Sequence, residues 1–154
     1  MEPRAPALVV FACVYNAGRP QMAAAWFTRM VDPSRARAIS AGTRPGGEVH
    51  AVVVQAMQEV GVDLSAATPR LLTPALAAGA RVLVTMGCGE DCPYIPGAER
   101  DDWLLKDPAH LPIEDVRVIR EEIRQRVSRL LATRGWSRTE PQPSGDDKRE
   151  GARG

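Results

Sequence analysis

The sequence predicts an α/β fold, a three-layer domain in which a four-stranded parallel sheet is flanked by helices. Short, nearly all-apolar runs, ALVVFA at 7–12 and RVLVT at 81–85, are typical of strands buried on both faces. Longer segments whose apolar residues recur at helical spacing lie beside them in the chain. Strands that alternate with helices in this way are typical of parallel sheets.

The first half of the chain is predicted to contain two strands, each followed by a helix. The strand at 7–12 precedes a helix at 20–31, whose apolar residues recur at helical spacing. A second short strand is expected at 37–40. The stripe of apolar residues at 48–60 predicts the next helix, with Gly61 as its C-terminal cap.

The second half is predicted to begin with a short helix that Thr73 caps and Pro74 opens. The buried strand at 81–85 follows, and then a loop rich in glycine, cysteine and proline at 86–97. A fourth strand is expected at 103–105. A long helix at 113–131 comes last, with its acidic residues towards the start and its basic residues towards the end, as the helix dipole favours.

Length and composition predict a single catalytic domain at 1–134 and a disordered, polar C-terminal tail at 135–154. The 20 basic and 19 acidic residues nearly cancel, which disfavours nucleic acid and anionic membranes as partners. No apolar run reaches the roughly 18 residues of a membrane span, and no secretory signal is recognised. The three cysteines, an odd number, are expected to be free thiols in a cytoplasmic protein. Nothing in the sequence demands more than a monomer.

The loop between the first strand and the first helix has the composition of an oxyanion-binding loop. The free N–H groups and the positive end of the following helix favour an anion there. Arg19 can donate two hydrogen bonds to a tetrahedral oxyanion, and the same positive field is expected to lower the pKa of Cys13. The predicted loop consists of Cys13, Val14, Tyr15, Asn16, Ala17, Gly18 and Arg19.

Two interpretations of this loop compete. Cys13 could be an inert buried cysteine at a strand end, with Arg19 on the surface. The position of the loop between a buried strand and an amphipathic helix favours chemistry instead, with Cys13 as the nucleophile. Asn16 and Gly18 are residue types that tolerate the left-handed backbone such a loop needs.

With Cys-x5-Arg directly after the first strand and Asn16 three residues after the cysteine, the sequence resembles low-molecular-weight tyrosine phosphatases and the arsenate reductases related to them. The similarity covers about residues 7–131, and its fold agrees with the one predicted above. Three further segments are more similar to the thiol-coupled reductase branch: QMAAAWF at 21–27, SAGT at 40–43 and VTMGC at 84–88.

The resemblance implies a general acid at the Asp-Pro pair formed by Asp107 and Pro108. A carboxylic acid near the nucleophile can protonate the leaving group. Taken alone, Asp107 would be interpreted as an acidic turn residue before a proline. Tyrosine phosphatases of the family carry aromatic residues just after this pair, whereas this chain has Ala109, His110 and Leu111.

Cys88 and Cys92 are candidate resolving thiols for arsenate reduction, because a second thiol must attack the Cys13 sulfur to release reduced arsenic. An external small thiol or a thioredoxin-like protein could act instead. A zinc site at this pair is disfavoured because two further ligands at close spacing are missing. No bound cofactor is expected, and His50 and His110 are predicted to be surface or capping residues.

Pro20 departs from the family, in which a Ser or Thr after the loop arginine hydrogen-bonds the thiolate. Proline suits the first turn of a helix but supplies no hydroxyl. Three functions follow as hypotheses: an arsenate reductase, a low-molecular-weight phosphatase that works through a phosphocysteine, and a catalytically impaired module that binds oxyanions. The substrate in each is an arsenate- or phosphate-type oxyanion.

Overall fold

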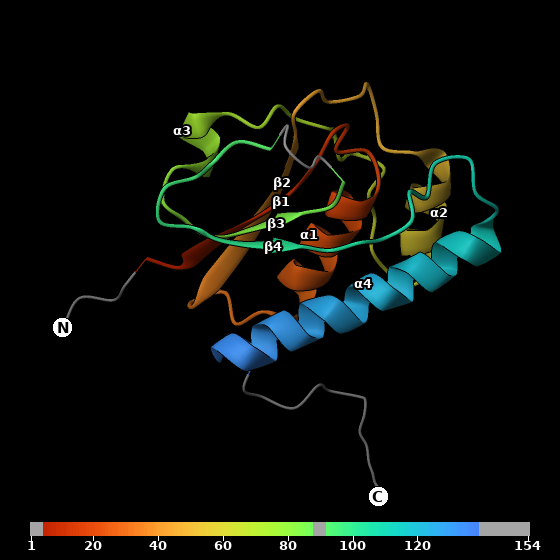
Figure 1. Cartoon of the computed structure of the whole chain (residues 1–154). Helices are drawn as coiled ribbons and strands as arrows, with labels where there is room; N and C mark the ends of the chain where they lie inside the picture. Colours follow the sequence, from red (N-terminus) through yellow and green to blue (C-terminus); the bar gives the residue numbers. More distant parts are fainter. Residues whose placement is uncertain (1–4, 88–91, 139–154) are drawn as a thin grey trace, which may run out of the picture.

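The computed structural model describes residues 5–87 and 92–138 and has a four-stranded parallel sheet at its centre (Figure 1). The strand order is β2-β1-β3-β4, so β1 and β3 are central and β2 and β4 are edges. The strands are β1 (Ala7–Cys13), β2 (Ala36–Gly42), β3 (Ala80–Thr85) and β4 (Glu99–Asp102). The helices are α1 (Arg19–Met30), α2 (Ala51–Gln58), α3 (Pro74–Ala77) and α4 (Ile113–Arg134).

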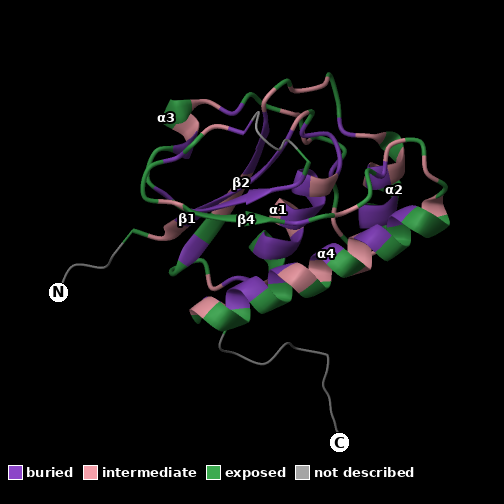
Figure 2. Cartoon of the chain, viewed as in Figure 1, coloured by how far each residue is buried: buried purple, intermediate pink, exposed green. Residues whose placement is uncertain are grey.

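Helices cover the two faces of the sheet unequally. The larger core packs α1, α2 and α4 against one face, around the buried Phe11, Phe27 and Met57. A smaller cluster that includes Val10, Leu83 and Cys92 covers the other face, where α3 lies. Figure 2 shows the central strands and the inner faces of the helices as buried. The predicted three-layer α/β architecture is therefore confirmed.

The fourth strand was predicted in the wrong place. It spans Glu99–Asp102 rather than 103–105, and all four of its residues are exposed. An edge strand needs only the backbone pairing to β3, so its charged sequence gives no apolar signal. The hydrophobic residues that suggested a strand follow it. Trp103 packs into the core, whereas Leu104 is 87% exposed.

The predicted start of the C-terminal tail at Gly135 needs a correction. Gly135 caps α4 in the left-handed conformation, with φ 71°. The chain then packs back onto the domain, because Trp136 is buried in the larger core and Ser137 forms a bridge with Val31. The rest of the predicted tail, 139–154, lies outside the described residues.

An ion-pair cluster holds α2 against α4. Glu59, one residue past α2, accepts hydrogen bonds from the guanidinium groups of Arg117 and Arg120. These bonds lower the pKa of the Glu59 carboxyl to about 2. Arg120 also donates to the carbonyl of Ala56 at 2.8 Å. The cluster fixes the far end of α2, the helix whose other end lies beside the Cys13 loop.

Candidate active site

The Cys13 loop is positioned by the register of the sheet. Cys13 is the last residue of β1 and pairs with Gly42, the last residue of β2. α1 begins at Arg19, so the loop turns directly from strand to helix. The site therefore lies at the carboxyl end of the central strands, where parallel sheets bind ligands.

Backbone hydrogen bonds from the segment after β2 support this loop. The N–H groups of residues 43, 44, 46 and 50 donate to four loop carbonyls, those of Cys13, Val14, Tyr15 and Ala17. In a trans peptide the next N–H points opposite to the carbonyl. The N–H groups that follow these carbonyls therefore point away from the segment. One of them, the N–H of Asn16, donates to Sγ of Cys13 at 3.1 Å.

Two glycines allow the close packing around the loop. A Cβ on Gly42 would lie 2.5 Å from the Val14 carbonyl oxygen. A Cβ on Gly18 would lie 2.8 Å from Cγ of Pro108, so Gly18 lets the Asp-Pro segment approach the loop. Asn16 has the expected left-handed backbone with φ 53°. Gly18 does not have a left-handed backbone, since its φ is −145°. Glycine is needed at this position because a Cβ would be too close to Pro108.

A cavity of about 160 Å³ opens over the Cys13 thiol. Asp107, the candidate acid, lines it and accepts a hydrogen bond from the N–H of Ala109. Arg19 reaches it from α1 and donates to the carbonyl of Leu105 at 2.9 Å. The lining residues are Cys13, Val14, Tyr15, Ala17, Gly18, Arg19, His50, Gly87 and Asp107.

Two of these residues, His50 and Gly87, were not predicted from the sequence to belong to the site. Gly87 follows β3, has φ 111°, and packs against Arg19, since a Cβ there would lie 3.3 Å from both terminal guanidinium nitrogens. Its position two residues after the buried strand β3 was a usable signal. His50 was predicted to be a surface or capping residue; it is the N-cap residue of α2, without a side-chain cap hydrogen bond, and it also lines the cavity.

Burial raises the pKa of Cys13 above the ordinary value of a thiol. The hydrogen bond from Asn16 and the charge of Arg19 act in the opposite direction, and the Asp107 carboxyl adds to the rise. The direction is therefore opposite to the one expected from the positive field of the loop. The thiol is only 4% exposed, and loss of water outweighs the positive field.

Pro20 is expected to contribute to this high pKa. It is buried in the first turn of α1 and has neither an N–H nor a hydroxyl to offer the thiolate. A Pro20→Ser variant should lower the pKa of Cys13, measured from the pH dependence of alkylation by iodoacetamide. Pro20→Ala is the control, because it removes the ring without adding a hydroxyl. Equal thiol pKa values in the Ser and Ala variants would contradict this explanation.

Cys92 is not among the described residues that line the cavity. Cys92 is buried in the smaller core on the opposite face of the sheet, and its sulfur is in a disulfide. Cys13 carries a free thiol. Cys88 lies outside the described residues. In this state, Cys92 is not available as a thiol.

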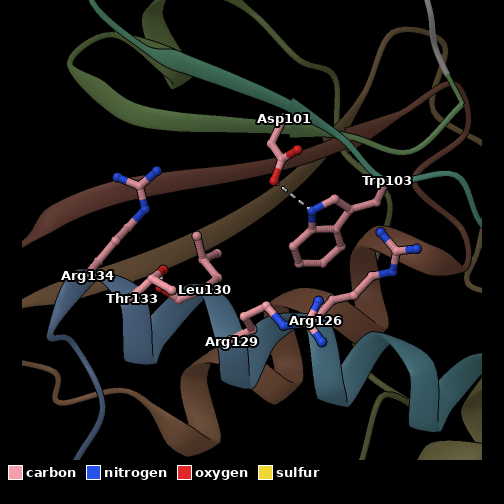
Figure 3. Close-up of a pocket in the computed structure, with 7 residues that line it drawn as sticks. All are labelled: Asp101, Trp103, Arg126, Arg129, Leu130, Thr133 and Arg134. Carbon is pink, nitrogen blue, oxygen red and sulfur yellow. Dashed lines mark hydrogen bonds between the residues drawn. The ribbon is translucent and has the colours of Figure 1, made fainter.

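A second hollow, of about 250 Å³, lies between β4 and α4 (Figure 3). The indole N–H of Trp103 donates to Asp101 there, and Arg126 lies over the indole ring. Arg126 is paired with Glu122 and Arg134 with Glu99. The Arg134–Glu99 pair joins α4 to β4 beside this hollow.

Residues 8–138 match the family described as low molecular weight phosphotyrosine protein phosphatase, and the chain belongs to this family. A Halobacterium salinarum protein named "Putative arsenate reductase" is 37% identical over 125 residues, covering 79% of this chain and 88% of the relative. The glutaredoxin arsenate reductase of Synechocystis is 30% identical over 127 residues, covering 80% of this chain and 95% of the relative.

A solved structure with the same fold is the thioredoxin-dependent arsenate reductase of Corynebacterium glutamicum. It matches with a TM-score of 0.72 and 34% identity over 86% of this chain, which spans 63% of that protein. These similarities confirm the predicted family, its arsenate reductase branch and the prediction of a cysteine-dependent enzyme. Within residues 5–87 and 92–138, no helix is long and apolar enough to cross a membrane.

Proposed function

We propose that this chain is an arsenate reductase with Cys13 as its nucleophile. The observation that carries the proposal is the shared cavity, in which a free thiol, a guanidinium and a carboxyl meet. A cavity of about 160 Å³ suits a small tetrahedral oxyanion. Arg19 and the N–H groups of the loop would bind three of its oxygens, and the fourth would be the leaving group.

In the first step the Cys13 sulfur attacks arsenic. A sulfur–arsenic bond forms and one arsenic–oxygen bond breaks. Asp107 donates a proton to the departing hydroxide, which leaves as water. Because burial raises the pKa of Cys13, the thiol proton must also leave, and a bound arsenate dianion is a suitable acceptor. Arsenic remains pentavalent at this stage.

In the second step a thiolate attacks the Cys13 sulfur. A disulfide forms, the sulfur–arsenic bond breaks, and its electron pair stays on arsenic, which leaves as arsenite. The attacking thiol belongs either to Cys88 or Cys92, after reduction, or to an external donor. The names of the relatives support a glutaredoxin- or thioredoxin-like donor. Such donors keep thiols reduced in the cytoplasm, where we place the protein.

Phosphatase activity is the second candidate, and Tyr15 favours it. This aromatic side chain lines the cavity and is 55% exposed, so it can contact an aryl group. The residues after Pro108 add no aromatic ring, because they are Ala109, His110 and Leu111. Both reactions begin with attack by Cys13, so weak turnover of an aryl phosphate is compatible with the reductase proposal.

Mass spectrometry of the fully reduced protein after exposure to arsenate, without an external thiol, tests the proposal. We expect a loss of two hydrogens, mapped to a disulfide between Cys13 and Cys88 or Cys92, or between Cys88 and Cys92 after exchange. Cys13→Ser is the control and should show no arsenate-dependent disulfide. An unchanged mass with arsenite formed only on adding thioredoxin or glutaredoxin would assign the second step to the external donor. No arsenite under either condition would overturn the reductase proposal.

A further inference from the structure

His50 is fixed beside the Cys13 loop by its backbone. Its N–H donates to the carbonyl of Ala17 at 2.9 Å. Its own carbonyl accepts hydrogen bonds from Val53 and Val54, in the first turn of α2. The ion-pair cluster around Glu59 holds the other end of this helix. The histidine backbone therefore belongs to the rigid frame of the loop.

The imidazole of His50 lines the same cavity as the thiol. Its Cδ2 lies 3.4 Å from the position of a Cβ on Gly18, which places the ring against the loop wall. The side chain is half-buried. Among residues 5–87 and 92–138, no hydrogen bond or ion pair of the imidazole is found. A histidine that only capped α2 would hydrogen-bond the helix through its side chain, and this one does not.

The positive charge that lines the cavity is smaller than the negative charge of a bound oxyanion dianion. Among the described residues, the titratable groups that line the cavity with His50 are Cys13, Tyr15 and Arg19 of the loop and Asp107 of the segment after β4, and Glu48 lies two residues before His50 in the chain. Among the described residues, Arg19 is the one permanent cation that lines the cavity. Cys13, with its raised pKa, is an uncharged thiol at neutral pH. A dianion in this site therefore favours a second positive charge.

We propose that protonated His50 is a second cationic ligand of the oxyanion, so that the affinity for the anion falls as the imidazole loses its proton. Histidine is the side chain whose charge ordinarily changes between about pH 5 and 8. Binding and protonation are linked, so the bound anion also makes the His50 proton harder to remove. The inference rests on the proposed oxyanion site.

Sulfate is the probe for the test, because it stays a dianion between about pH 5.5 and 8 and is neither reduced nor transferred. We expect the full chain to bind sulfate about tenfold more tightly at pH 5.5 than at pH 8, as measured by calorimetry, the size of one charge-assisted contact. The His50→Asn variant should lose most of this pH dependence. His110→Asn is the matched control, because His110 is exposed and does not line the cavity.

An NMR titration of the two histidines distinguishes anion binding by His50 from a purely structural role of this side chain. Saturating sulfate should raise the pKa of His50 by about one unit and leave that of His110 unchanged. Sulfate binding that is independent of pH, or an unchanged His50 titration, would overturn the role of His50 alone. Failure of sulfate to bind at either pH would overturn the oxyanion site and with it the proposed function.

Discussion

Replacing Cys13 by serine should abolish arsenate-dependent turnover, by about 10³-fold or more. A serine hydroxyl at the end of β1 is far less acidic than a thiol, so it is a much weaker nucleophile at neutral pH. The second step also needs sulfur, because a disulfide must form at this position. The assay is arsenite production with glutaredoxin or thioredoxin as the electron donor.

The Cys13→Ser variant should keep its fold and its anion site. The side chain is buried, and oxygen for sulfur is a small change in volume, so sulfate affinity should stay within a few-fold of the wild type. Cys92→Ser is the comparison for a cysteine outside the cavity and should leave the first step intact. Turnover that survives in Cys13→Ser would show that another residue carries the chemistry.

Gly42→Ala should damage stability and anion binding together. The added methyl would lie 2.5 Å from the Val14 carbonyl oxygen and 3.0 Å from the backbone nitrogen of Asn16. Both contacts are with backbone, so the loop itself must move. We expect a loss of about 1–3 kcal/mol in the free energy of unfolding, measured in urea, and a sulfate affinity at least about tenfold weaker.

The control for this substitution lies five residues further on. A Cβ on Gly47 would meet nothing within 4 Å, so Gly47→Ala should leave both stability and sulfate affinity unchanged. If Gly42→Ala behaved like Gly47→Ala, the tight contact between the end of β2 and the loop would not be needed for the site.

The central sheet was predictable because its strands are buried on both faces, which leaves uninterrupted apolar runs at β1 and β3. The position of β4 was not predictable, since this edge strand has the charged sequence Glu-Arg-Asp-Asp and no apolar run. The Cys13 loop was recognisable because its residues are contiguous. His50 joins it from 31 positions beyond Arg19, through a backbone hydrogen bond that no local pattern reveals. The direction of the Cys13 pKa depends on burial, which the sequence does not display.

The depth of the Cys13 thiol also governs which electrophiles reach it. With 4% of the residue exposed, beneath a cavity of about 160 Å³, the sulfur is screened from bulky reagents. An aromatic disulfide reagent of the kind used to quantify thiols should therefore react far more slowly with Cys13 in the folded protein than in the denatured protein. A small tetrahedral anion enters without unfolding. The cavity is therefore expected to slow the reaction of Cys13 with glutathione disulfide and similar large oxidants, relative to its reaction with a small anion.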